Sequence, residues 1–286
     1  MRLGLMLSGR LGEILLNFCL QNYEVTAVLT DKNSKAIIEG ASKRDIPCFV
    51  GNPRNKRAAE FTKSYSVDLL LSINYLFIVE PDVIEWPKLE AVNFHGSLLP
   101  KYRGRTPHIW AIINNEQETG VTAHKLVEEC DEGDILIQKL LPIEYEDTGA
   151  DILRKFESIY PKIASEVIEM YNSGTIKAKK QNNEEATYFG KRTPKDGKIN
   201  WSWQKERIRN WVRAQAFPYP GAFSFINGKK VIIDRIDYDE LGFQSEQPNG
   251  MILRINPVRV KTPNGVVKLS EVREGAEHIK QTTVLD

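Results

Sequence analysis

The first 95 residues alternate short apolar runs with segments of helical periodicity, and this alternation constrains the fold more than any other feature of the chain. The runs that predict strands cover residues 2–7, 24–30, 47–50, 67–73 and 91–95. Between them, apolar residues at helical spacing predict helices over residues 11–21, 35–44 and 58–64. Strands that alternate with helices form an open, mostly parallel sheet covered by helices. We therefore predict an α/β domain whose ligands bind beyond the carboxyl ends of the strands.

The part of the chain after residue 216 follows a different pattern. Asn227-Gly228 and Asn264-Gly265 each separate two alternating apolar runs. Asn-Gly readily adopts the positive φ angles of a two-residue hairpin turn, so each pair is a strong hairpin signal. We therefore predict a small antiparallel β domain and expect it to form a barrel.

Between these two parts lie a helical segment and a polar segment. Residues 148–170 predict one or two helices, interrupted at Pro161. Residues 173–192 are polar and rich in turn formers, which is typical of a linker. The expected organisation is an α/β domain over residues 1–186, a linker over 187–200 and a β-barrel domain over 201–286.

The composition excludes several classes of protein. With 39 basic and 38 acidic residues the formal net charge is +1, whereas proteins that grip nucleic acid usually carry a basic excess. No stretch approaches the roughly 20 continuous apolar residues of a membrane helix. The three scattered cysteines argue against a disulfide framework and against a zinc site. We expect a cytoplasmic protein with no nucleic-acid partner, no membrane association and no metal.

One segment, residues 91–138, concentrates the side chains suited to chemistry. Asn93 and His95 alternate at the carboxyl end of a predicted strand, so both point to one face. An amide donor beside an imidazole suits acyl transfer, because one group stabilises an oxyanion and the other moves a proton. A carboxylate directed at His95 would fix its tautomer and raise its pKa. Sequence spacing leaves Asp131 and Asp134 as alternatives for that carboxylate.

Other candidate residues have simpler interpretations. His124 lies in a predicted strand, where a structural or supporting role is favoured. His108 opens a predicted helix and is expected to act in capping. Cys130 has no histidine nearby in sequence, which argues against a nucleophile. The barrel core, rather than a shelf for a nucleotide base, is the expected place of three aromatic residues: Phe217, Tyr219 and Phe223.

The turn after the first predicted strand reads Gly9-Arg10-Leu11-Gly12. A dinucleotide fingerprint has three glycines, so two favour a tight turn into a helix over a nicotinamide site. The N-terminus of that helix still offers N–H groups to a phosphate. The residues that we expect to contact the substrate are Ser8, Gly9, Arg10, Arg103, Lys191, Arg192 and Tyr219.

Four motifs occur together in the chemical segment: Asn93-x-His95, Ser-Leu-Leu-Pro-x-x-Arg-Gly over residues 97–104, Gly-Val-Thr over 120–122 and Asp-x-Gly-Asp over 131–134. With them the chain resembles the folate-dependent formyltransferase family. That family includes methionyl-tRNA formyltransferase, glycinamide ribonucleotide formyltransferase and the amino-sugar N-formyltransferases. The resemblance covers most of the chain and weakens after about residue 240. Further matching segments are residues 189–194, 197–201, 212–214 and 218–223.

The resemblance implies a fold, an activity and a site. The fold would be a Rossmann-like formyltransferase domain followed by an OB-like β-barrel, and family members are often homodimers. Asn93, His95 and Asp131 would form the catalytic set, with 10-formyltetrahydrofolate as co-substrate and no metal. The folate would lie against the backbone of Tyr75, Leu76, Phe77, Ser97, Leu98, Leu99 and Pro100.

The acceptor amine divides the family into three groups. Glycinamide enzymes generally lack a C-terminal barrel. The tRNA enzymes usually carry a basic insertion soon after the second strand, and residues 30–35 leave no room for one. Residues 101–107, 189–194 and 219–223 look closest to enzymes acting on UDP-linked 4-amino-4-deoxy-L-arabinose, with the N-formyltransferases of dideoxy-amino sugars also near. We therefore expect a UDP- or dTDP-linked amino sugar destined for a surface glycan such as lipopolysaccharide.

Two other enzymatic functions remain as alternative hypotheses. One is methionyl-tRNA formyltransferase, whose architecture the chain shares by resemblance. The other is a formyltetrahydrofolate hydrolase, in which water replaces the acceptor amine. A non-catalytic folate- or sugar-binding module is less favoured, because binding alone would not need an intact Asn-His-Asp set.

Overall fold

The computed structural model describes residues 1–286, and the chain divides into two compact units. Unit 1 comprises Met1–Gly104, Thr119–Leu141 and Lys155–Phe189. Unit 2 comprises Arg105–Glu118, Pro142–Arg154 and Gly190–Asp286. Because segments of the two units alternate along the chain, the domain boundaries expected at residues 186 and 200 stay a prediction. None of the helices combines the length and the apolar character that crossing a membrane demands.

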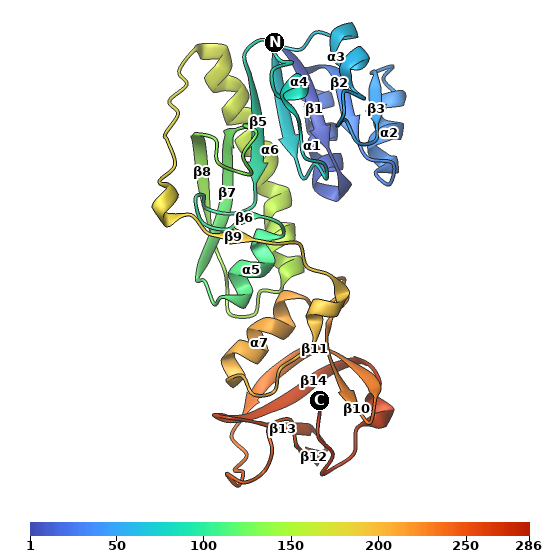
Figure 1. Ribbon diagram of the computed structural model, residues 1–286, viewed down its shortest axis with the longest axis vertical. Coiled ribbons are helices and arrows are strands. Elements are labelled where there is room, and N and C mark those ends of the chain that lie inside the picture. The colour runs from blue at the N-terminus through green and yellow to red at the C-terminus, as the bar shows by residue number, and fades with distance from the viewer. The chain divides into compact units, whose positions relative to one another are not determined.

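Unit 1 is built on a seven-stranded sheet with the order β3-β2-β1-β4-β5-β7-β8 (Figure 1). Neighbouring strands from β3 to β5 are parallel, and β7 runs antiparallel to β5. The strands are β1 (Arg2–Leu7), β2 (Glu24–Thr30), β3 (Cys48–Val50), β4 (Leu69–Ile73), β5 (Glu90–His95), β7 (Glu118–Lys125) and β8 (Ile135–Pro142). The helices around them are α1 (Gly9–Asn22), α2 (Lys35–Ser42), α3 (Ala59–Ser64), α4 (Pro81–Ile84) and most of α6 (Gly149–Ser173). The predicted α/β class with a mostly parallel sheet is confirmed.

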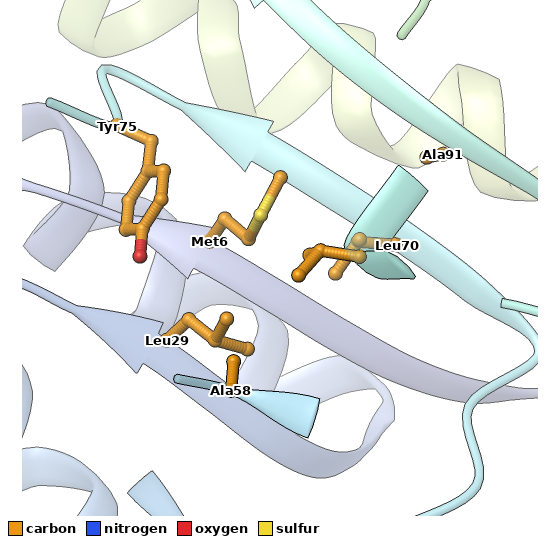
Figure 2. Close-up of a cluster of buried hydrophobic side chains, with 7 residues drawn as sticks. Met6, Leu29, Ala58, Leu70, Tyr75 and Ala91 are labelled. Carbon is orange, nitrogen blue, oxygen red and sulfur yellow. The ribbon is translucent and has the colours of Figure 1, made fainter. Parts of the chain in front are cut away.

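The central strand of this sheet, β4, is buried along its whole length. All five residues of β4 are buried, and a strand covered on both faces has a continuous apolar sequence rather than an alternating one. Figure 2 shows part of the core on one side, where Met6, Leu29, Leu70 and Tyr75 come together from β1, β2, β4 and the loop after β4. These side chains hold the central strands in place, and with them the loops that follow the strands.

Helix α6 corrects one expectation. The interruption predicted at Pro161 was wrong, because α6 runs unbroken through it. Proline removes one N–H from the hydrogen-bond ladder of a helix. The apolar side of α6 is buried, including Phe156 and Tyr160, and the Tyr160 ring lies 6.3 Å from the ring of Phe94 on β5. Burial of that side outweighs one missing backbone hydrogen bond.

Unit 2 contains a five-stranded antiparallel sheet with the order β10-β11-β14-β13-β12. Both predicted hairpins are confirmed, since Asn227-Gly228 joins β10 to β11 and Asn264-Gly265 joins β13 to β14. Asn227 and Gly228 have φ angles of 50° and 76°, the positive values that a tight hairpin turn requires. The strands are β10 (Ala222–Ile226), β11 (Lys229–Asp239), β12 (Ile252–Ile255), β13 (Val258–Thr262) and β14 (Gly265–Glu274), and the helices are α5 (Pro107–Ile113) and α7 (Lys205–Ala214).

A two-stranded parallel sheet completes unit 1 by pairing β6 (Arg103–Gly104) with β9 (Tyr188–Phe189). The rings of Tyr102 and Phe189 stack beside it, 4.9 Å apart and 15° from parallel. The chain that returns from α6 toward β9 also buries Gln181, of which 6% is exposed. Much of the segment predicted as a polar linker, residues 173–192, is therefore built into unit 1.

Candidate active site

Strand register brings the two candidate side chains of β5 beside a histidine of β7. In the antiparallel β5–β7 pair, Asn93 lies opposite His124 and His95 lies opposite Thr122. Residues directly opposite on neighbouring strands share a face of the sheet, and so do residues two apart along one strand. Asn93, His95 and His124 therefore lie on one face, with His95 as the last residue of β5.

The Nε2 nitrogen of His95 is held by a hydrogen bond to the backbone. Its Nε2 lies 2.7 Å from the carbonyl oxygen of Tyr102. A carbonyl oxygen only accepts hydrogen bonds, so Nε2 carries the proton and donates it. In the neutral imidazole the lone pair is then on Nδ1, which lies 3.5 Å from Oδ1 of Asp131. The Tyr102 carbonyl, rather than the expected carboxylate, thus sets the tautomer of His95.

The pKa of His95 is lowered from its ordinary value, mainly because burial penalises the charged form. Asp131 and the hydrogen bond to Tyr102 act in the opposite direction, while His124 lowers the pKa further. The expected influence of the carboxylate has the predicted sign. The expected net rise in the pKa of His95 was wrong, because desolvation of the imidazole outweighs its attraction to the Asp131 carboxylate. His95 is therefore neutral at pH 7, and its Nδ1 is able to take a proton.

Asp131 faces the three polar side chains of the two strands. Its Oδ1 lies 3.4 Å from Asn93 Nδ2 and 3.5 Å from both His95 Nδ1 and His124 Nε2, while Oδ2 accepts the backbone N–H of Gly104 at 2.8 Å. Burial opposes its ionisation, but at the low pH where a carboxyl titrates the protonated imidazoles, together with the Gly104 N–H, outweigh it, and the pKa of Asp131 lies below the ordinary range. The carboxylate is therefore charged at neutral pH.

Asp134, the alternative carboxylate, contributes a backbone contact instead. Its carbonyl oxygen accepts the N–H of Lys125 at 2.9 Å, which ties the end of the loop to β7. Asp131 is thus the acid of this loop that the structure brings to His95.

His124 fixes the amide of Asn93. The imidazole is almost fully buried, and Nδ1 donates to the carbonyl of Lys125 at 2.8 Å. Nε2 is then the acceptor of the neutral ring, and it takes an N–H from Asn93 Nδ2 at 3.1 Å. The second N–H of that amide faces Asp131 across the longer 3.4 Å contact. The supporting role expected of His124 fits this geometry.

The residues predicted to line the folate lie in two loops of unit 1. Tyr75 is buried in the core of Figure 2 and Phe77 packs against that core, whereas Leu76 is exposed. In the second loop Ser97 Oγ donates to the carbonyl of Lys101 at 2.7 Å. Leu98 and Pro100 are half-buried, and Leu99 donates its N–H to Thr122 Oγ1 at 3.2 Å. The side chains mostly face inward, so these loops offer backbone and the exposed Leu76.

The turn after β1 already uses part of its hydrogen-bonding capacity. The N–H of Gly9 donates to Ser34 Oγ at 2.9 Å, and Ser34 Oγ donates to Asp31 Oδ2 at 2.6 Å. Ser8 is buried, and Arg10 points to solvent in an ion pair with Glu13. A phosphate at this helix end would therefore lie close to the Asp31 carboxylate.

Arg103 has a structural role in this arrangement. Its side chain has no exposed surface, and its N–H groups face Gln181, Asn183, Tyr188 and Glu132. Since a guanidinium has five N–H donors, these contacts leave none for a ligand. The placement does not support the substrate contact predicted for Arg103.

The remaining predicted substrate residues belong to unit 2. Lys191 is exposed, while the guanidinium of Arg192 lies 5.0 Å from the ring of Trp110 and 4.4 Å from the ring of Trp211. Both rings are within the distance of a cation–π contact with Arg192. The hydroxyl of Tyr219 lies 2.9 Å from His108 Nε2. His108 does not cap α5, because Thr106 is the N-cap residue.

The expected core position of three aromatic residues was right for Phe223, of which 8% is exposed, and wrong for Phe217, of which 71% is exposed. Phe217 follows the end of α7, and the guanidinium of Arg273 lies 5.6 Å from its ring. A position between α7 and β10 places its ring outside the alternation of the sheet.

Sequence reasoning missed three groups around the site: the Tyr102 carbonyl, the Gly104 N–H and the Gln181 side chain. The first two are backbone atoms, which leave no signal in residue type. No group of three or more His, Cys, Asp or Glu side chains is arranged to hold a metal ion. The site offers one imidazole base, one charged carboxylate and one amide donor. Acyl transfer to an amine can use groups of these kinds.

Two family models match this chain. Residues 12–168, more than half of the chain, match the family model described as formyl transferase, and residues 191–285 match the formyl transferase C-terminal domain. The bifunctional polymyxin resistance protein ArnA of Wigglesworthia glossinidia brevipalpis is 37% identical over 219 residues, which are 76% of this chain. The chain spans about a third of the length of that relative, 33%.

Two solved structures share the fold. The N-formyltransferase from Helicobacter canadensis, in complex with folinic acid and dTDP-3-aminofucose, superimposes with a TM-score of 0.75 at 23% identity, over 94% of this chain and 98% of that chain. Methionyl-tRNA formyltransferase from Clostridium thermocellum gives a TM-score of 0.60 at 19% identity, over 96% of this chain and 100% of that chain. From the two family models and the geometry of the site, the chain belongs to the formyl transferase family.

Proposed function

We propose that this chain transfers a formyl group from 10-formyltetrahydrofolate to the amine of a UDP- or dTDP-linked amino sugar. The observation that carries the proposal is the placement of Asn93 and His95 on one face of β5 with the Asp131 carboxylate beside both, 3.5 Å from His95 Nδ1 and 3.4 Å from Asn93 Nδ2. Family membership supports formyl transfer. The ligands named for the Helicobacter canadensis enzyme support a folate donor and a nucleotide-sugar acceptor.

In the proposed reaction the neutral acceptor amine attacks the formyl carbon and forms a new C–N bond. Nδ1 of His95 takes a proton from the attacking nitrogen, and Asp131 stabilises the resulting imidazolium. The bond between the formyl carbon and N10 of the folate then breaks, and that nitrogen receives the proton. The lowered pKa of His95 keeps the base neutral before the attack.

Asn93 would stabilise the oxyanion of the tetrahedral intermediate. One of its N–H groups is held by His124 at 3.1 Å, which fixes the plane of the amide. The other faces Asp131 across 3.4 Å, a long contact that an oxyanion would replace with a shorter one. A fixed donor of this kind is typically worth about a hundred- to a thousandfold in rate.

The binding roles follow from the same proposal. The folate would lie against the backbone of residues 75–77 and 97–100, beside the exposed Leu76. Ser8, Gly9 and Arg10 would meet the diphosphate, and Tyr219, with the exposed Lys191, would contact the acceptor. We further propose a cytoplasmic homodimer whose product enters a surface glycan, and light scattering of the purified protein tests the dimer.

His95→Asn tests the reaction mechanism. We expect the variant to keep the fold, by circular dichroism, and to lose at least about a hundredfold in rate, because general acid–base catalysis typically contributes that much or more. His278→Asn is the matched control, because it removes a histidine of unit 2 that pairs only with its neighbour Glu277. Near-normal turnover by a folded His95→Asn protein would remove His95 from the mechanism.

The acceptor is tested by single-turnover transfer from 10-formyltetrahydrofolate to a panel of UDP- and dTDP-linked amino sugars, with methionyl-tRNA alongside. We expect a product heavier by the mass of one added CO on one nucleotide sugar and none on tRNA. Formylation of tRNA alone would overturn the sugar acceptor and leave the site intact. Cleavage of the folate without any formylated product would identify a hydrolase instead.

A further inference from the structure

The contacts between the Asp131 carboxylate and the side chains of β5 and β7 hold its loop only weakly. Asp131 has a φ angle of 58°, in the left-handed region that a non-glycine residue rarely adopts. Its carboxylate makes contacts of 3.4 to 3.5 Å with the groups of β5 and β7, which are long for hydrogen bonds. These contacts alone hold the loop weakly.

Gln181 supplies a further restraint from a distant part of the sequence. It is 6% exposed, and its Nε2 donates to the carbonyl of Asp131 at 2.8 Å and to the carbonyl of Gly133 at 2.7 Å. Both N–H groups of one side-chain amide are thus spent on the backbone that flanks the Asp131 side chain. Gly133 itself lies so close to β7 that an added Cβ would come within 1.8 Å of the Lys125 carbonyl.

The other end of the same amide is anchored in turn. Oε1 of Gln181 accepts from Arg103 Nε at 3.2 Å and from Nη2 at 2.8 Å. Arg103 is bound through its backbone N–H to the carbonyl of Thr187 at 2.8 Å, in the segment that follows Gln181. The next residue, Gly104, donates its N–H to Asp131 Oδ2. Gln181 therefore connects the backbone of the Asp131 loop to the strand that binds its carboxylate.

We propose that Gln181 is a positioning residue for the reaction: through its amide, clamped between Arg103 and the carbonyls of Asp131 and Gly133, it sets the distance between Asp131 and His95. The kinetic consequence rests on the proposed function. The geometric consequence does not, because the distance between Asp131 and His95 exists in the free protein.

The distance between Asp131 and His95 can be followed through the pKa of His95, because that pKa depends on the charges around the imidazole. The groups that act on the imidazole are Asp131, which raises its pKa, and His124 on β7, which lowers it. The Tyr102 carbonyl adds a hydrogen bond, and Tyr160 on α6 is neutral and lies near Asp131. A neutral substitution of Gln181 changes none of these charges. If Asp131 moves away, the pKa of His95 falls.

The test uses Gln181→Met in the full chain, since methionine is uncharged and close in volume. We expect kcat for formyl transfer to fall by about ten- to a hundredfold, as displacements of about 1 Å do, while KM for folate and acceptor stays within about twofold. We also expect NMR titration of the His95 imidazole in the free protein to give a lower pKa than in the wild type.

Asn182→Ala is the matched control. Asn182 is exposed, caps the short turn that follows and makes no contact with the Asp131 loop, so we expect wild-type kcat and an unchanged His95 titration. If Gln181→Met does not fold, Gln181→Asn carries the same test, because its amide is one methylene too short to span both partners. We expect Gln181→Asn to fall between Gln181→Met and the wild type.

An unchanged His95 titration in a folded Gln181 variant would overturn the proposal, and so would equal losses of kcat in the Gln181 and Asn182 variants. If the wild type formylates no acceptor, the proposed function fails, yet the titration still decides the role of Gln181.

Discussion

A buried and a partly buried carboxylate in unit 1, Asp31 and Asp131, differ in the side chains around them. Asp31 follows β2 and accepts hydrogen bonds from the Ser34 hydroxyl at 2.6 Å and from the N–H of Asn33 at 2.8 Å. Asp131 also accepts a backbone N–H, from Gly104, but its other neighbours are one amide and two imidazoles. Hydroxyl and backbone N–H groups keep their protons at ordinary pH, whereas imidazoles gain and lose them. Burial of a carboxylate therefore does not by itself mark a reactive site. An imidazole beside the carboxylate, such as that of His95, does.

Removing each charge in turn gives the largest expected contrast. We expect Asp131→Asn to lower the rate of formyl transfer by about a hundred- to ten-thousandfold, because His95 loses the charge that stabilises its protonated form. Asp31→Asn is expected to stay within about threefold of the wild-type rate. Rates are measured at saturating folate and acceptor. Comparable losses in the two variants would break the distinction between them.

Ser34→Ala tests whether the hydrogen bonds around Asp31 stabilise the fold. The hydroxyl accepts from Gly9 N–H and donates to Asp31, so its loss leaves the buried Asp31 carboxylate and the Gly9 N–H without this partner. We expect the free energy of unfolding in urea to fall by about 1–3 kcal/mol, with the rate of the folded enzyme unchanged. A large loss of rate at full stability would instead place the turn after β1 in the catalytic machinery.

The pH dependence of stability separates the two sites further. The pKa of His95 is lower in the folded chain than its unfolded value of about 6.5, so the unfolded state binds more protons as the pH falls. The contribution of His95 to stability is therefore present above about pH 6.5 and is lost as the pH falls toward its folded pKa, with a slope of at most about 1.4 kcal/mol per pH unit.

We expect His95→Asn to flatten this slope below pH 6.5, and Asp31→Asn to leave it unchanged, in urea unfolding at each pH. An equally steep slope in His95→Asn would assign the titration to another group.

The smallest expected effect is that of Arg10→Ala on stability. Arg10 is exposed and pairs with Glu13 one turn along α1, so we expect a change below about 0.5 kcal/mol. If Arg10 meets the diphosphate of the acceptor as proposed, KM for the nucleotide sugar rises severalfold while kcat stays constant. An unchanged KM would remove Arg10 from the binding site.

Much of unit 1 was predictable because local patterns are strong there. The strand over residues 24–30 was predicted with the bounds that β2 has, and the Asn-Gly hairpins of unit 2 were predicted from turn chemistry alone. Pro161 was misread because a local rule about proline was applied without the burial that holds α6 together. Arg103 was misread because an arginine in a motif carries no information on whether solvent reaches it.

The candidate site was also predictable from the sequence only in part. A period of two along β5 was enough to place Asn93 and His95 on one face, and four motifs were enough to indicate the family. The pairing of Asn93 with His124 depends on strand register, which spacing does not reveal. The net shift in the pKa of His95 depends on how far the fold desolvates it, which no motif records.

The sequence by itself determined the α/β class, the antiparallel C-terminal sheet and the residues able to do acyl chemistry, because all three depend on periodicity and residue type. The carbonyl that sets the tautomer of His95 and the amide that holds the Asp131 loop became known only from the tertiary structure. Such interactions join residues far apart in the chain, such as Gln181 and Asp131, and their contacts exist only after the backbone has folded back on itself.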